Sequence, residues 1–85
     1  MPYYDKAKKL YEVHQYAKAI EYFQEFLAER PYEPLRSIAM YQLGYSYQMT
    51  GDVKEAKAIY HRIVTDGSGD PFWIEVAQKR LAELE

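Results

Sequence analysis

Few side chains in this sequence could carry out acid–base or metal chemistry. His14 and His61 are its two imidazoles, no carboxylate pair lies at a ligand spacing shared with both, and cysteine is absent. Metal binding and general base catalysis both need several such groups within reach of one another. No serine has a recognisable base, and no glycine motif that cradles a phosphate is present. We therefore predict a chain that is not an enzyme and that needs no cofactor or metal.

The segment DGSGDP places Asp66, Ser68 and Asp70 at alternate positions, as at the start of a calcium-binding loop. The likeness ends there, because Pro71 stands where such a loop needs glycine and Ala77 stands where it needs a bidentate glutamate. The end of one helix and the start of the next explain the segment better, with Asp70 as the N-cap and Pro71 in the first turn. We expect no ion at this position.

The charge balance bears on the class of partner. The chain has 11 basic and 13 acidic residues, so it lacks the basic excess that marks a nucleic-acid interface. No segment approaches the roughly 20 apolar residues of a membrane-spanning helix, and the start, MPYYDKAKKL, lacks the apolar run of a signal peptide. We expect no nucleic-acid partner and no insertion into a membrane. The chain as given reads as cytoplasmic, and a bacterial periplasmic location would require that it is a trimmed segment of an exported protein.

Glycine and proline residues divide the chain into about five segments. None of the segments shows the two-residue alternation of a half-buried strand, so the expected class is all-α. The short connections between them predict that neighbouring helices pack antiparallel. The predicted helices are Pro2–Val13, Tyr16–Glu29, Leu35–Met49, a helix capped by Asp52 that runs through Val64, and Pro71–Leu84.

The chain is similar to itself at an offset of 37 residues. A further offset of 33 residues carries the start of the second unit onto the last predicted helix, which therefore repeats the first helix of the unit without its second. Nearly every aligned pair keeps its size class: Ala7 with Gly44, Leu10 with Tyr47, Tyr16 with Val53, Ala19 with Ala56, Phe23 with Tyr60, Leu27 with Val64, and then Met40, Leu43 and Gly44 with Trp73, Val76 and Ala77.

At these positions the sequence resembles the tetratricopeptide repeat family. The family's pattern of large, small and aromatic residues is present in the second unit at Met40, Leu43, Gly44, Tyr47, Gly51, Ala56 and Tyr60. In the first unit His14 takes the place of the inter-helix glycine, and the matching positions are Tyr3, Lys6, Ala7, Leu10, Ala19, Phe23 and Pro31. The resemblance implies a right-handed superhelical stack of antiparallel helix hairpins in one domain, residues 1–85, with repeats at about 2–33 and 35–66 and a capping helix at about 70–84.

Three segments carry a narrower likeness. FLAERP, LGYSYQMTGD and AQKRLAEL are similar in loop length and composition to parts of bacterial repeat proteins of the cell envelope. Proteins of that kind help to assemble outer-membrane proteins or coordinate cell division. This likeness favours a bacterial source, with the location left open between the cytoplasm and the bacterial periplasm.

Gly44 stands in the interior of a predicted helix, where glycine costs about 1 kcal/mol relative to alanine. The resemblance implies that small residues at this position let the two helices of a hairpin, and the next unit, approach closely. We predict that Gly44 is a packing residue. The same purpose is predicted for Ala7, Ala19, Ala56 and Ala77.

One stripe of residues remains for the inner curve of the stack. The resemblance implies that this surface binds an extended or helical segment of a partner protein, and the tyrosines in it suit such a role because each combines a large ring with a polar tip. The alternative is that the inner helices touch one another and the tyrosines complete the core. The clamp with which chaperone-binding members hold carboxylates is not reproduced. The candidate groove residues are Tyr4, Lys8, Tyr11, Ile38, Tyr41, Tyr45, Gln48, Ile74, Gln78 and Leu81.

Self-assembly is the second functional alternative. Apolar residues near the ends of the stack, such as Tyr3, Phe72 and Leu84, could dock onto another copy of the chain. Against this, charged side chains along one side of the last helix predict a solvent-exposed cap and hence a monomer: Glu75, Lys79, Arg80 and Glu83.

Overall fold

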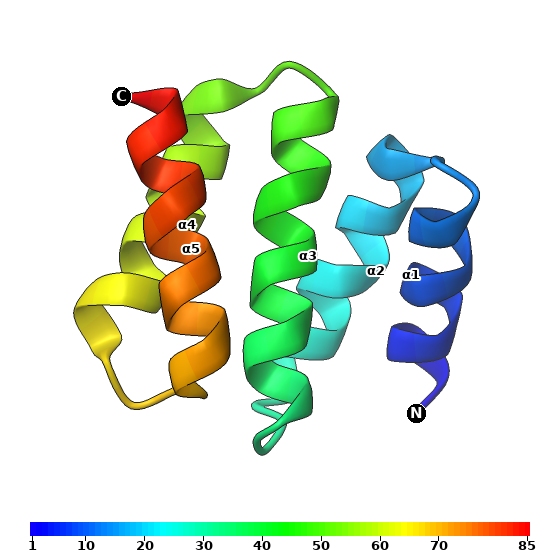
Figure 1. Cartoon of the computed structure of the whole chain (residues 1–85). Coiled ribbons are helices and arrows are strands. Elements are labelled where there is room, and N and C mark those ends of the chain that lie inside the picture. Colours follow the sequence, from blue (N-terminus) through cyan, green and yellow to red (C-terminus); the bar gives the residue numbers. More distant parts are fainter.

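Glycine and proline punctuate five α-helices in the computed structural model, which describes residues 1–85 (Figure 1). The prediction of an all-α chain is confirmed, and no strand is present. The predicted ends differ from the observed ones by at most two residues. The helices are α1 (Pro2–Glu12), α2 (Tyr16–Ala28), α3 (Leu35–Met49), α4 (Val53–Asp66) and α5 (Pro71–Leu84).

The helix ends follow from local capping chemistry. The side chain of Asp52 accepts a hydrogen bond from the backbone N–H of Glu55 at 3.2 Å, and that of Asp70 accepts from Phe72 at 2.9 Å. Each bond satisfies one of the free N–H groups in a first helical turn. Gly67 ends α4 with a φ of 69°, the left-handed conformation that glycine adopts without steric cost. These residues therefore define the helix ends, and the caps predicted at Asp52 and Asp70 are confirmed.

The turn between α1 and α2 has an unusual residue. His14 adopts a positive φ of 64°, in the place where the repeat pattern has glycine. Non-glycine residues reach this region infrequently. The imidazole ring stacks on the ring of Tyr16, with centroids 5.5 Å apart and planes 11° from parallel. The backbone thus keeps the shape that the pattern requires although the residue has changed.

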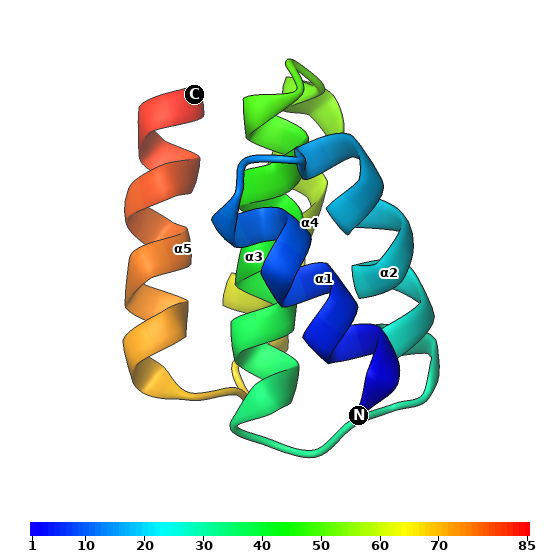
Figure 2. The same ribbon diagram turned by 90° about the vertical axis from the view of Figure 1, so that its right-hand side faces the viewer.

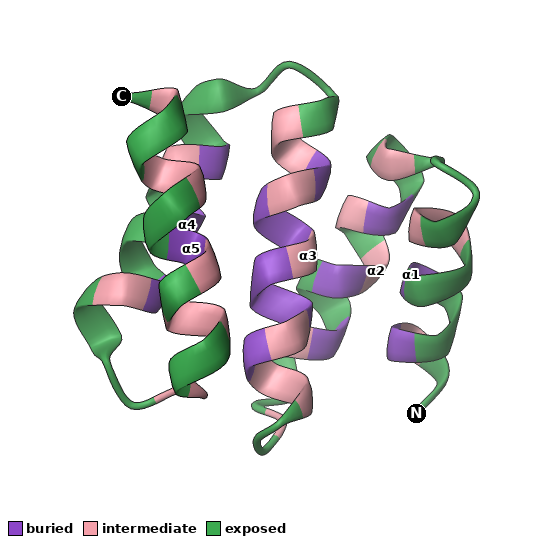
Figure 3. Ribbon diagram, viewed as in Figure 1, coloured by how far each residue is buried: buried purple, intermediate pink, exposed green.

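The helices form hairpins that stack around α3. In Figure 1, α3 lies between α1 and α5, and Figure 2 shows α2 on the opposite side of α3 from α5, with α4 behind α3. The α3 helix contacts all four other helices, whereas α2 and α4 do not contact each other. Seven of its 15 residues are buried, which Figure 3 shows as the purple bands along α3. This arrangement fits a stack of helix hairpins of the tetratricopeptide type.

Small residues sit at the tightest contacts of the core. A Cβ atom added to Gly44 would lie 2.8 Å from Cε1 of Tyr60, which is closer than real Cβ atoms approach other side chains. Gly44 therefore lets α3 and α4 approach, and the prediction that it is a packing residue is confirmed. The four alanines predicted for the same purpose are fully buried: Ala7, Ala19, Ala56 and Ala77.

The loops at one end of the stack are tied together by Ser37. Its hydroxyl group donates to the Glu33 carboxylate at 2.8 Å and accepts from the backbone N–H of Asp70 at 3.2 Å. The same carboxylate accepts from the backbone N–H of Ser37, so it also caps α3. Gly69 fits against this hydroxyl, since an added Cβ would lie 2.6 Å from the Ser37 Oγ atom. The start of α3 and the start of α5 are thereby held at a fixed spacing.

Candidate functional site

The groups considered first for acid–base or metal chemistry are dispersed. His14 and His61 are both exposed, on the α1–α2 turn and on α4. No group of three or more His, Cys, Asp or Glu side chains lies close enough together to hold a metal ion. Asp66 accepts hydrogen bonds from Arg36 at 3.2 Å and Ser68 at 2.7 Å. None of the five helices combines the length and the hydrophobicity that crossing a membrane requires.

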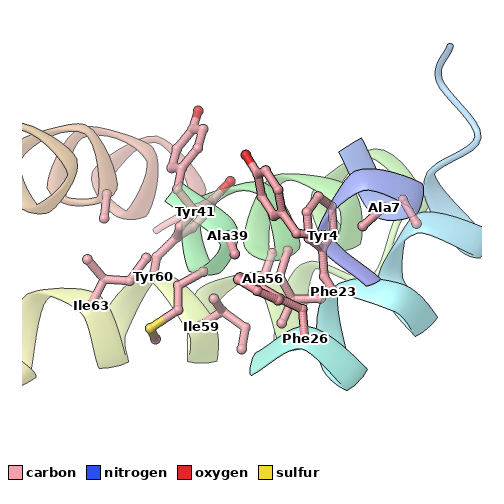
Figure 4. Packing of buried hydrophobic residues seen from close by; sticks show 14 residues of the cluster. Tyr4, Ala7, Phe23, Phe26, Ala39, Tyr41, Ala56, Ile59, Tyr60 and Ile63 are labelled. Atoms are coloured by element: carbon pink, nitrogen blue, oxygen red, sulfur yellow. The ribbon is translucent and has the colours of Figure 1, made fainter. Parts of the chain in front are cut away.

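Aromatic side chains gather where α1 and α5 flank α3. Tyr4 and Tyr41 belong to the core and are each 8% exposed. Figure 4 shows their hydroxyl groups on the same side of the buried cluster, away from Phe26 and Ile59. The Tyr4 hydroxyl donates to Oε1 of Gln42 at 3.4 Å. These two tyrosines therefore have buried rings and hydroxyl groups that reach the inner side of the stack.

Three further tyrosines of this surface pack edge to face against one another. The ring centroids of Tyr11 and Tyr16 are 5.7 Å apart, and Tyr45 lies 6.0 Å from each of them. All three are half-buried, and their hydroxyl groups make no hydrogen bond within the chain. No buried side-chain nitrogen or oxygen lacks a partner, so these hydroxyl groups are not fully buried. We call the five tyrosines the tyrosine face: Tyr4, Tyr11, Tyr16, Tyr41 and Tyr45.

Arg80 joins α5 to the tyrosine face. Its Nε atom donates to the Tyr41 hydroxyl at 3.0 Å, and its guanidinium group lies over the Tyr45 ring, 5.4 Å from the centroid. The prediction that Arg80 belongs to a solvent-exposed side of α5 is wrong, because this side chain is half-buried against α3. The sequence did contain a signal. Arg80 lies seven residues after Trp73 and three after Ala77, so a helix places it on their inward side.

Trp73 is the second residue of this surface that was not among the predicted groove residues. The centroid of its ring lies 5.2 Å from that of Tyr41. Tyr16 is the third, because the sequence placed it at the start of α2 and not on the inner helices. Its contact with Tyr45 depends on the position of the α1–α2 turn, which no local pattern specifies.

The remaining predicted groove residues divide into three groups. Lys8 and Gln78 are exposed on α1 and α5. The side-chain carbonyl of Gln48 accepts a hydrogen bond from the Tyr60 hydroxyl at 2.9 Å, so it is already engaged by α4. The aliphatic members are half-buried and packed against the core cluster: Ile38, Ile74 and Leu81. The structure thus brings the tyrosines together and leaves the polar members at the margin.

The residues considered for self-assembly differ in exposure. Phe72 is 62% exposed at the start of α5, whereas Tyr3 and Leu84 are half-buried against the core. Lys79 pairs with Glu75 at 3.6 Å, and Arg80 pairs with Glu83 at 3.4 Å. A single exposed phenylalanine gives little apolar area for a dimer.

Burial makes the tyrosines harder to ionise, and this leads to a prediction about alkaline pH. Desolvation raises the pKa of Tyr11 and of Tyr60 well above the ordinary value near 10, and neighbouring tyrosines add to the effect. In the unfolded chain both groups ionise near pH 10, while the folded chain keeps them protonated. The free energy of unfolding should therefore be unaffected by them below about pH 10 and should fall as the pH rises further.

This pH dependence can be measured by following phenolate absorbance and far-ultraviolet circular dichroism together. We expect some tyrosines to ionise near pH 10 and the rest to ionise together with loss of helix. Ionisation of all ten tyrosines in one step near pH 10, with the helical signal unchanged, would contradict the burial argument.

Comparison with family models matches residues 38–66 to the tetratricopeptide repeat. The matched segment contains most of α3 and all of α4. Comparisons with curated proteins and with solved structures found no match. The likeness to bacterial envelope proteins stays a prediction.

Proposed function

Because residues 38–66 form a tetratricopeptide repeat, we propose that the chain binds a segment of a partner protein against its tyrosine face. The tetratricopeptide repeat is a non-catalytic helical fold that generally mediates contacts between proteins. The proposal adds the location and the chemistry of the bound segment. Its site is the inner surface of α1, α3 and α5, and its occupant is an extended or helical segment that supplies hydrogen-bond partners and apolar side chains.

The observation that carries the proposal is the set of free hydroxyl groups on Tyr11, Tyr16 and Tyr45. Their rings are held by edge-to-face contacts, so a ligand would meet groups that have already lost most of their rotamer freedom. Each hydroxyl group can both donate and accept, which suits the N–H and C=O groups of a peptide backbone. Rigid tyrosines of this kind are favoured in binding surfaces.

Arg80 and Lys8 give this surface a positive margin. The guanidinium group of Arg80 is fixed by Tyr41 and Tyr45, and Lys8 is exposed on α1. Glu83 neutralises part of the charge of Arg80 through their ion pair. The five tyrosines themselves are uncharged, so the tyrosine face favours a segment that is mainly neutral, with apolar side chains against the rings.

The proposal predicts that removing hydroxyl groups weakens binding without weakening the fold. Peptides selected from a random displayed library would be measured against the double variant Tyr11→Phe/Tyr45→Phe. Because these hydroxyl groups make no hydrogen bond within the chain, the free energy of unfolding should stay unchanged, while loss of two hydrogen bonds to the ligand should weaken binding about tenfold.

The matched control is Tyr32→Phe, since Tyr32 is 92% exposed on the α2–α3 loop, away from the tyrosine face. It should bind selected peptides as the parent does. Equal affinity of the double variant for every selected peptide would overturn the proposal. A chain mass of a dimer in light scattering, reduced to a monomer by the same double variant, would instead assign the tyrosine face to self-assembly.

A further inference from the structure

A second surface lies on the outer side of the stack, between α2 and α4. These two helices each contact α3 but not one another, so a groove of about 730 Å³ remains, with α3 as its floor. This volume lies within the range of sites that bind small ligands and short peptides. The groove is separate from the tyrosine face, which is formed mainly by the inner surface of α1, α3 and α5.

The centre of the outer groove is apolar. Met40 and Leu43 of α3 lie along its floor, with Leu27 of α2 and Ile59 of α4 on the two sides. Leu27 is half-buried, and the other three are buried but still border the groove. Four aliphatic side chains around one hollow favour an occupant that places aliphatic side chains there.

Three arginines gather at one end of the outer groove: Arg30 from the α2–α3 loop, Arg36 from the first turn of α3 and Arg62 from the second half of α4. Arg36 and Arg62 also line a smaller hollow that continues the groove beside Thr65 and Asp66. Arg30 and Arg62 form no ion pair within the chain, whereas Arg36 pairs with Glu33 at 3.5 Å and with Asp66 at 3.2 Å. Two guanidinium groups without an ion pair thus lie at this end of the groove, although the chain as a whole carries a net charge of -2.

The opposite end of the groove has different chemistry. Glu55 contributes a negative charge there, and the Gln24 side-chain amide donates to the Tyr47 hydroxyl at 2.7 Å. Arg36 and Tyr47 stand eleven residues apart on α3, which corresponds to about 16 Å of helix and to roughly five residues of extended peptide. The groove therefore distinguishes one end of an occupant from the other.

From this polarity we propose that the outer groove binds an extended acidic peptide of about five residues. Its carboxylates pair with Arg30 and Arg62, with Arg36 beside them, and its aliphatic side chains cover Met40, Leu43 and Ile59. A guanidinium group suits this task because it holds a carboxylate with two parallel hydrogen bonds. A nucleic acid fits less well, because the basic groups occupy one end and an aliphatic floor cannot pair with a sugar–phosphate backbone.

Two labelled pentapeptides test this proposal by fluorescence anisotropy. The first has three leucines followed by two glutamates and a free carboxyl terminus. In the second, glutamines replace the glutamates and the terminus is amidated. We expect saturable binding of the acidic peptide and at least tenfold weaker binding of the neutral one, because each charged hydrogen bond contributes about a factor of ten or more. Equal affinities, or no saturable binding of the acidic peptide, would overturn the proposal.

Matched variants locate the binding. Arg30→Gln/Arg62→Gln should weaken the acidic peptide at least tenfold, while Lys9→Gln/Lys18→Gln removes the same charge from the outer side of α1 and α2 and should leave its affinity within a factor of two. Tyr11→Phe/Tyr45→Phe should also bind it normally, so the outer groove can fail or succeed independently of the tyrosine face. Retained binding by the arginine variant overturns the proposal.

Two further measurements test other occupants of the outer groove. If a short single-stranded oligonucleotide displaces the acidic peptide at equal or lower concentration, the occupant of the outer groove would be a polyanion and not a peptide. If light scattering shows a dimer that Arg30→Gln/Arg62→Gln converts to a monomer, the occupant of the outer groove would be a second copy of this chain. Either result overturns the proposed occupant. A monomer from which the oligonucleotide does not displace the acidic peptide supports it.

Discussion

Replacement of Phe23 by alanine should lower the free energy of unfolding by about 3 to 5 kcal/mol. Phe23 is fully buried on α2, and its ring packs against Tyr4 at 6.4 Å and Tyr11 at 6.0 Å between ring centroids. Truncation would remove these contacts and leave a cavity between α1 and α2. For a chain of 85 residues, the total stability is of the order of 4 to 13 kcal/mol, so the loss is a large fraction of it.

Urea unfolding followed by circular dichroism measures this effect, and the midpoint should fall by several molar if the slope is about 1 kcal/mol/M. Phe72→Ala is the matched control. Phe72 is 62% exposed, so the same truncation at that position should change the stability by less than about 0.5 kcal/mol. Equal effects of the two substitutions would show that the first hairpin is not packed around Phe23.

The helices could be predicted from the sequence because their ends depend on neighbours in the chain. Asp52, Asp70 and Gly67 act within one turn of their own positions, and the structure places Asp52 and Asp70 in the capping role expected of each. The internal repeat then indicated which positions pack between helices, since Gly44 and the alanines aligned with it lie at these contacts. Both kinds of information are local or periodic.

The details that escaped prediction all join segments distant in the chain. Ser37 meets the backbone of Asp70 across 33 positions, and Arg80 meets Tyr41 across 39. Such contacts depend on the distance and angle between α5 and α3, which helical periodicity does not predict. The outer groove escaped for the same reason, because its arginines come from the α2–α3 loop, α3 and α4 and stand at unrelated spacings in the sequence.

The two alternatives for the inner stripe, a core and a binding surface, concern different atoms. The rings of Tyr4 and Tyr41 complete the core, while the hydroxyl groups of Tyr11 and Tyr45 stay free. A small stack has few aliphatic residues with which to fill its inner side, and tyrosine can bury its ring and still present a polar group to water. One residue type can therefore stabilise the fold and line a proposed binding surface, so a binding test must use substitutions that keep the ring.

Gly44→Val should lower the free energy of unfolding by about 3 kcal/mol. An added Cβ would already lie 2.8 Å from Tyr60 and 3.2 Å from Ile59, and valine adds two more methyl groups. Tyr60 cannot easily move, since it is fully buried and its hydroxyl group donates to Gln48 at 2.9 Å. The contact lies at the centre of the α3–α4 hairpin, so the helices themselves must separate.

The control Ala58→Val introduces the same side chain at an exposed position of α4 and should cost less than about 1 kcal/mol, the difference in helix propensity. A second variant, Tyr60→Leu, removes the ring that the valine would strike. If overpacking is the cause, Gly44→Val/Tyr60→Leu should be more stable than the sum of the two single changes implies, by about 1 kcal/mol or more. Additive effects would mean that the cost of Gly44→Val arises elsewhere, and the close approach of α3 to α4 would not be the reason for glycine at this position.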